Sequence, residues 1–283
     1  MASAADFRLE IVRVSLATDS STRDWPNEDF AAITPGVAVL IDGAGSPGGR
    51  ETGCVHGVAW YARTLGAHLA ASAVVTSTAL ADVLADSISQ VSAMHSGTCD
   101  LHHPGTPSAT VVLVRTNGDT LEYLVLTDSV LLLLPIAGEP VVISDTRLED
   151  IAAGLRPNYR ELAGSREREA VRQAYLSKLD ALRNQPGGYW SAAADPAAAE
   201  QAITGTSAIA DLEAVALLSD GAGRLADRYH QATWPQIAAT LAEHGPGELI
   251  RQLRAVEAAD PEGKRWPRGK LRDDATAVYW ALR

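Results

Sequence analysis

The sequence of 283 residues is poor in cysteine and phenylalanine, and it contains no apolar run long enough to cross a membrane. Its two cysteines, Cys54 and Cys99, show neither the spacing of a metal site nor a disulfide framework, which fits a reduced cytoplasmic setting. Residues 1–10 do not have the pattern of a signal peptide. We therefore expect a cytoplasmic protein without a membrane partner, in which both thiols are core or loop residues.

Positive charge is also scarce. The 24 Lys and Arg residues stand against 35 Asp and Glu residues, which gives a net charge of −11 and a pI near 5.1. Nucleic acids bind positively charged surfaces, so this composition argues against a nucleic-acid partner. The hydrophobic content of 46% is enough for a sizeable core, and no linker separates two halves of the chain. We expect a single domain over residues 1–283.

What the sequence does contain is a set of apolar runs that end or begin at a carboxylate. The run Val37–Ile41 stops at Asp42, and the glycine-rich stretch after it allows the backbone to turn tightly. The same arrangement recurs at Glu28-Asp29 before Phe30, at Asp128 after Leu121–Leu126, at Asp220 after Ala214–Leu218, and at Asp273-Asp274 before Ala275–Leu282. Gathered carboxylates repel one another, and a hard divalent cation is the usual way to neutralise them.

Hydrophobic periodicity predicts an α+β fold. Strands are expected at Phe7–Leu16, Phe30–Ile33, Val37–Ile41, Ala109–Arg115, Leu121–Thr127, Val130–Pro135, Val141–Ser144, Ala214–Leu218 and Ala275–Leu282. Helical stripes begin near Val55 and Leu80, and further helices are expected over Ser165–Leu182, Asp195–Ala202 and Trp234–Ala258. Hairpin signals such as Asn117-Gly118 make residues 109–144 a meander, so the sheets should be antiparallel and covered by helices.

Five short motifs follow one another along the chain: Asn27-Glu28-Asp29, Ile41-Asp42-Gly43, Thr127-Asp128-Ser129, Ser219-Asp220-Gly221 and Asp273-Asp274-Ala275-Thr276. In this order they resemble the metal-dependent type-2C serine/threonine protein phosphatases, and the resemblance extends from about Val12 to Leu282. It implies a four-layer α/β/β/α sandwich, in which two antiparallel sheets lie face to face and an antiparallel helix pair covers each.

The resemblance also implies a centre with two Mn²⁺ or Mg²⁺ ions. Asp42 would bridge both ions, and the Gly43 carbonyl would bind one of them. The other ligands implied are Asp220 and Asp273 on the second ion, Glu28 or Asp29 directly or through a water, and Asp128 on a weaker third ion. Asp42, Asp220 and Asp273 would act in catalysis through a metal-bound water, which attacks the phosphate of a phosphorylated protein or peptide.

The sequence departs from the family pattern at four places. Ala44 stands where some members carry a histidine that is proposed to protonate the leaving group. Asp24 occupies the position of the phosphate-binding arginine, and Arg23, one residue away, is the candidate for that role. Val130 replaces an arginine after Thr-Asp-Ser, and residues 145–209 form an atypical segment similar to an actinobacterial subgroup. These departures keep open an alternative, a low-activity scaffold that binds a regulator or a phosphoprotein.

Other sequence features favour simpler interpretations. His102-His103 has no ligand partner at helix or hairpin spacing and is expected to be a polar loop pair. Residues 44–48 nearly match a serine-hydrolase nucleophile elbow, but they lack its first glycine and place Pro47 after the serine. The basic segment Lys264–Arg272 lies just before Asp273. It is either a solvated loop or a means of attracting an anionic phosphopeptide.

Overall fold

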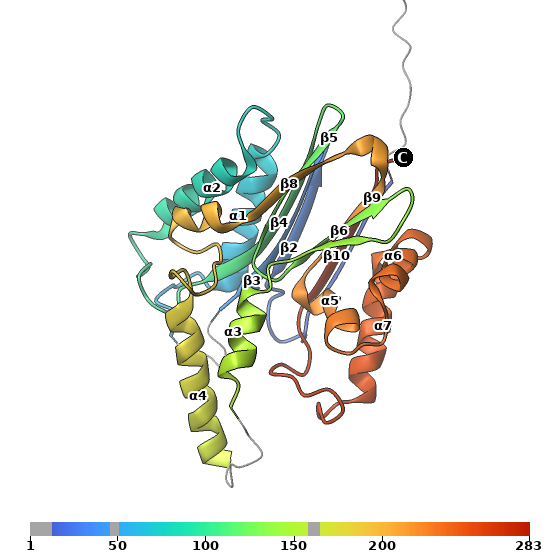
Figure 1. Cartoon of the computed structure of the whole chain (residues 1–283). Coiled ribbons are helices and arrows are strands. Elements are labelled where there is room, and N and C mark those ends of the chain that lie inside the picture. Colours follow the sequence, from blue (N-terminus) through green and yellow to red (C-terminus); the bar gives the residue numbers. More distant parts are fainter. Residues whose placement is uncertain (1–12, 46–50, 158–164) are drawn as a thin grey trace, which may run out of the picture.

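The computed structural model describes residues 13–45, 51–157 and 165–283. In these residues the strands form two five-stranded antiparallel sheets (Figure 1). The first sheet has the order β1 (Val14–Asp19), β10 (Ala275–Ala281), β9 (Leu212–Leu218), β6 (Val130–Pro135), β7 (Val141–Ile143). The second has the order β2 (Asp29–Thr34), β3 (Val37–Ala44), β4 (Ser108–Asn117), β5 (Thr120–Leu126), β8 (Ile203–Ala208).

Helices cover the outer face of each sheet, which completes the expected α/β/β/α layers (Figure 1). The second sheet is covered by α1 (Val58–Ser72) and α2 (Leu80–His95), and the first by α5 (Asp220–Asp227), α6 (Trp234–Glu243) and α7 (Pro246–Ala259). None of the helices in the described ranges is both long and apolar enough to span a membrane.

The alternation of side chains along β3 explains why its sequence is apolar without interruption. Val39 and Ile41 pack with the helix residues Tyr61 and Leu65, whereas Ala38 and Leu40 belong to a cluster shared by both sheets. Successive side chains of a strand point to opposite faces, so a strand between a helix layer and a second sheet is buried on both. The same holds for β4, β6 and β9, and the core is therefore divided among three interfaces.

The atypical segment, residues 145–209, follows β7 and ends with β8. It forms α3 (Arg147–Leu155) and α4 (Ser165–Leu182), which lie beyond one end of the sheets in Figure 1. The bounds of α4 match those expected from the sequence. A 3₁₀ helix, η2 (Pro196–Gln201), follows, and its cap Asp195 accepts a hydrogen bond from the backbone N–H of Ala197 at 2.9 Å. A second, η3 (Ile209–Asp211), connects β8 to β9.

Several expectations of secondary structure were wrong. Residues 109–144 do not form one meander, because β5 and β6 do not pair and the chain crosses there from one sheet to the other. The helix expected over Trp234–Ala258 is two helices. The backbone at Gly245 has φ +82°, which ends the first helix, and Pro246 begins the second.

Other expectations were wrong in the bounds of an element, or missed the element altogether. Val55 precedes α1 and is 77% exposed, so it is not part of the buried stripe. The strand expected at Phe7–Leu16 runs on to Asp19, and residues 7–12 lie outside the described residues. Both β8, which is mostly polar, and the glycine-containing α5 were missed.

Substitutions at two helical glycines would test how closely α1 packs on β2. A Cβ on Gly66 of α1 would lie 2.2 Å from Cδ1 of Phe30 in β2, whereas a Cβ on Gly154 of α3 would meet open space. We expect Gly66→Ala to lower the free energy of unfolding by about 1–3 kcal/mol through overpacking. The matched change Gly154→Ala should be neutral or stabilise by up to about 1 kcal/mol through helix propensity. Urea unfolding measures both, and equal effects would contradict the close contact of α1 with β2.

Candidate metal centre

The hairpin of β2 and β3 brings three of the predicted acidic residues to one edge. Asp29 and Asp42 are directly opposite each other in the strand register. The backbone N–H of Gly43 donates to the carbonyl of Glu28 at 3.1 Å. A Cβ at Gly43 would lie 2.6 Å from that carbonyl oxygen, so this approach of the two backbones requires glycine.

The other sheet delivers Asp220 and Asp273 to the same edge. Asp220 is the first residue of α5, separated from the end of β9 by Ser219, and its backbone N–H donates to Oδ2 of Asp42 at 3.2 Å. This contact connects the two sheets at the site. A Cβ at Gly221 would lie 1.9 Å from the carbonyl oxygen of Asp274, so glycine also permits the start of α5 to approach the chain just before β10.

Asp273 and Asp274 make separate sets of contacts. The carboxylate of Asp273 accepts hydrogen bonds from Arg224 at 2.5 Å and from Lys270 at 2.7 Å. Asp274 instead accepts the backbone N–H groups of Ser21 and Glu28, at 2.6 and 2.7 Å. Asp274 therefore holds the loop between β1 and β2, while Asp273 lies among the charged side chains.

Asp128 lies where the chain crosses from one sheet to the other. The preceding residue, Thr127, has φ +68°, a left-handed conformation that costs a β-branched residue about 1–3 kcal/mol. Its hydroxyl donates to the carbonyl of Trp190 at 2.6 Å, which ties the crossing to the atypical segment. Burial, together with the charges of Asp220, Asp145 and Asp227, raises the pKa of Asp128 to about 7.

Burial and mutual repulsion disfavour the ionised form of most of these carboxyl groups. Burial raises the pKa of Asp42 well above its ordinary value, and the charges of Asp29 and Asp220 add to the effect. Burial also raises the pKa of Asp29 to about 7, although the Thr276 and Ser219 hydroxyls partly offset it. Asp29 is only 6% exposed, and neither of its carboxylate oxygens has a hydrogen-bond partner of normal geometry among the described residues.

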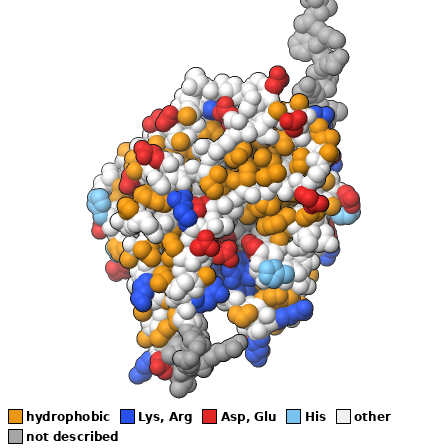
Figure 2. Space-filling model, in the orientation of Figure 1, with side chains coloured by type: hydrophobic (Ala, Val, Ile, Leu, Met, Phe, Trp, Pro, Cys, Tyr) orange, Lys and Arg blue, Asp and Glu red, His pale blue; other side chains and the backbone are white. Residues whose placement is uncertain are grey.

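Two cations offset part of this charge: Lys270 of the basic segment, and Arg224, which sequence reasoning did not single out. Arg224 lies one helical turn after Asp220 and contacts both Asp220, at 3.9 Å, and Asp273. Burial would raise the pKa of Asp220, but Arg224 and Lys270 outweigh it, and the pKa of Asp220 is lowered. Figure 2 shows acidic and basic side chains together on one face, between α3 and α5. The spacing of Asp220 and Arg224, four residues apart on a helix, was the available signal.

Most of the basic segment serves local structure. The Arg268 side chain is 1% exposed and pairs with Asp260 at 2.7 Å, and the guanidinium of Arg265 lies over the ring of Trp266. Lys270 is the member whose contacts reach the carboxylates. Arg23, the other candidate for binding phosphate, is exposed on the loop that Asp274 holds.

The donor set fits hard divalent cations. Its members are carboxylates of both sheets and the Gly43 backbone, and such cations prefer oxygen ligands. The carboxylate of Asp29, buried and without a hydrogen-bond partner of normal geometry among the described residues, is the observation that supports this fit. Asp227 is a further neighbour that the sequence did not indicate, and burial together with the charge of Asp220 raises its pKa to about 6.

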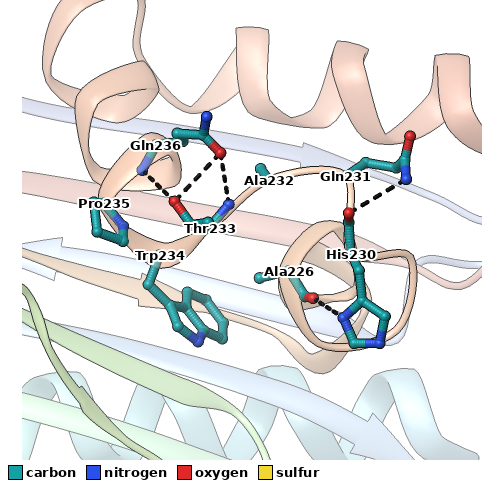
Figure 3. Close-up of a pocket in the computed structure, with 8 residues that line it drawn as sticks. All are labelled: Ala226, His230, Gln231, Ala232, Thr233, Trp234, Pro235 and Gln236. Atoms are coloured by element: carbon teal, nitrogen blue, oxygen red, sulfur yellow. Dashed lines mark hydrogen bonds between the residues drawn. The ribbon is translucent and has the colours of Figure 1, made fainter.

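A surface pocket of about 420 Å³ lies elsewhere, between α5 and α6 (Figure 3). Its polar groups hold the start of a helix. Thr233 and Gln236 form reciprocal hydrogen bonds, and Nδ1 of His230 lies 2.9 Å from the carbonyl oxygen of Ala226. Because no carboxylate lines it, this pocket is not the centre of the predicted chemistry.

The raised pKa of Asp29 makes stability depend on pH. The folded state binds this proton more tightly than the unfolded chain, whose aspartates titrate near about 3.9, so stability of the metal-free protein falls as pH rises from about 4 to about 7. We expect metal-free Asp29→Asn to melt a few degrees above wild type at about pH 8, with the difference shrinking toward about pH 4. Thermal unfolding measures this, with Asp86→Asn on the exposed face of α2 as the control. A mutant that melts lower than wild type at high pH would contradict the assignment.

The chain matches one known family model. The family model described as Protein phosphatase 2C matches residues 18–255. None of the curated proteins matches the sequence. The five motifs in order were therefore a correct indication of the family.

Solved structures show the same fold at low sequence identity. The Mycobacterium tuberculosis serine/threonine phosphatase PstP/Ppp is 16% identical with a TM-score of 0.56, covering 96% of this chain and 99% of that one. PppA of Pseudomonas aeruginosa, described as a regulatory component of a T6SS, is 18% identical with a TM-score of 0.56, covering 96% and 98%. The catalytic domain of PstP in complex with two manganese ions is 16% identical with a TM-score of 0.55, covering 95% and 97%. With a family model that spans most of its length, the chain belongs to the protein phosphatase 2C family.

Proposed function

We propose that the chain, as a metal-dependent serine/threonine protein phosphatase of this family, uses two Mn²⁺ or Mg²⁺ ions to hydrolyse phosphoserine and phosphothreonine in proteins. The observation that carries the proposal is the meeting of carboxylates from both sheets, joined by the hydrogen bond from the Asp220 N–H to Asp42. The two manganese ions of the PstP complex support the same number of ions here. No observation on the described residues favours the alternative of a low-activity scaffold.

The residues proposed to hold the ions are Asp42, the Gly43 carbonyl, Asp220, Asp273 and Glu28 or Asp29, with Asp128 proposed for a third ion. When bound, such ions supply an activated water and offset charge on the phosphoryl oxygens. The carboxylates of Asp29 and Asp42 have raised pKa values without a cation, so a cation beside them favours the ionised form that binds it.

Positive side chains at the edge of the centre are suited to hold the phosphate. The side chain of Lys270 is 55% exposed while its amine contacts Asp273, so it faces both the carboxylates and solvent. Arg23 lies on the loop that Asp274 fixes through Ser21 and Glu28. A phosphoryl group needs charge-assisted hydrogen bonds, and we propose that these two residues replace the arginines missing from the family pattern.

Metal dependence is the direct test. The purified protein should hydrolyse an aryl phosphate when Mn²⁺ is added and should stop when a chelator removes it, because the carboxylates alone cannot activate water. Asp42→Asn should reduce turnover by orders of magnitude under the same conditions. Activity that survives exhaustive chelation, or that Asp42→Asn leaves intact, would rule out the proposal.

The neighbours Asp273 and Asp274 separate a metal ligand from a residue that orients a loop. Asp273→Asn should lower Mn²⁺-dependent turnover by orders of magnitude and weaken metal affinity, because it removes a ligand charge. Asp274→Asn should cost only about tenfold, because it weakens the hydrogen bonds to the Ser21–Glu28 loop. Turnover measured across a Mn²⁺ titration distinguishes them. A dead Asp274→Asn with an active Asp273→Asn would reverse the assignment.

A further inference from the structure

A second group of chemically active side chains lies outside the carboxylate centre. Cys54 and His56 lie in the segment that leads into α1, His95 is the last residue of α2, and Cys99 lies in the turn after it. The sequence predicted no metal site here because the two cysteines are far apart along the chain. The antiparallel packing of α1 and α2 brings the two pairs together, and Cys-x-His with His-x₃-Cys was the signal in the sequence.

The four side chains are spaced like the ligands of one metal ion. The sulfur atoms of Cys54 and Cys99 are 3.3 Å apart, and those sulfurs lie 3.6 Å and 3.4 Å from Nδ1 of His95 and Nδ1 of His56, respectively. The ligand atoms of all four residues lie within 4.8 Å of one another. A tetrahedral zinc ion with bonds of about 2.0–2.3 Å places its ligand atoms about 3.3–3.8 Å apart.

Backbone N–H groups around the two sulfurs offset part of the burial that raises the pKa of the Cys54 thiol. The N–H groups of His56 and Gly57 hydrogen-bond to the Cys54 sulfur, and that of Val55 to the Cys99 sulfur. Donors of this kind stabilise the negative charge of a metal-bound sulfur and orient it. The two segments are also joined directly, because the N–H of Asp100 donates to the carbonyl of Gly53 at 2.8 Å.

The surroundings enclose the group on one side. His95 is 3% exposed and both cysteines are half-buried, whereas His56 is exposed. The indole ring of Trp60 stacks on His56 at a centroid distance of 4.3 Å and meets the edge of His95 at 5.0 Å. An ion could therefore enter past His56, and the other ligands are held by packing before it arrives.

We propose that Cys54, His56, His95 and Cys99 form a structural zinc site that fixes the start of α1 to the end of α2. Thiolate and imidazole ligands favour zinc over the Mn²⁺ or Mg²⁺ of an oxygen-lined centre, and four protein ligands leave no position for a substrate. Both sulfurs bind as thiolates, any proton that they still carry is released to solvent, and no change of oxidation state is involved. Because α1 packs on β3, the site stabilises the helix behind the strand that carries Asp42.

Bound Co²⁺ distinguishes this site from the carboxylate centre, because the carboxylate centre has no thiolate ligand. The chelator-treated full-length protein, kept reduced, should bind Co²⁺ with the thiolate-to-cobalt charge-transfer band and intense visible bands of a tetrahedral site, saturating at one ion per chain, and Zn²⁺ should displace it. Zn²⁺ should also slow alkylation of both thiols at least about tenfold, because a bound thiolate is a poor nucleophile. Both measurements use the wild-type protein and are independent of phosphatase activity.

Variants locate the ligands. Cys54→Ser and Cys99→Ser should each at least halve the charge-transfer band, because each removes one of the two thiolates, whereas His102→Ala, which removes an exposed loop histidine close in sequence to Cys99, should retain it in full. Absence of the band in the wild-type protein, alkylation that Zn²⁺ does not slow, or a band of undiminished intensity in Cys99→Ser would overturn the proposal. A Cys54–Cys99 disulfide in protein purified under anaerobic conditions would also overturn it, because the structure has both thiols free.

Discussion

The mutual repulsion of buried carboxylates is the constraint on which this structure depends. Asp29 and Asp42 face each other across a strand pair, and Asp220 reaches them from the other sheet. A fold selected for stability alone would not place these groups together, because desolvating several like charges is costly. The protein compensates in part with Arg224 and Lys270, and the raised pKa values of Asp29 and Asp42 show that compensation within the chain is incomplete. The remaining imbalance is what makes the edge suitable for cations.

The packing of the sandwich holds the carboxylates together, although their mutual repulsion favours their separation. Asp42, Asp220 and Asp273 are attached to β3, β9 and β10, whose side chains are buried on both faces, so these strands cannot shift without breaking two hydrophobic interfaces. Glycine at positions 43 and 221 lets neighbouring backbones approach within distances that any side chain would prevent. The carboxylate of Asp274 fixes the loop between β1 and β2 by accepting two backbone hydrogen bonds from it. The acidic edge is therefore preorganised by packing that lies mostly outside it.

The proposed zinc site and the carboxylate centre favour different metal ions, because their ligand atoms differ in softness. Carboxylate and carbonyl oxygens suit Mg²⁺ and Mn²⁺, and thiolates with imidazoles suit zinc. The two groups are connected through α1, which has the Cys54–His56 segment at its start and packs against β3 along its length.

The sequence by itself determined the family, the layer architecture and the acidic residues, because each depends on local patterns: apolar runs that stop at a carboxylate, and five motifs in a fixed order. Only the tertiary structure decided which charges meet. The crossing between sheets at Thr127, the pairing of Asp273 with Arg224 and Lys270, and the meeting of Cys54 with Cys99 all join residues through packing that leaves no periodic trace in the chain. Side-chain convergence depends on helix and sheet docking, and docking is set by many weak contacts that no short stretch of sequence encodes.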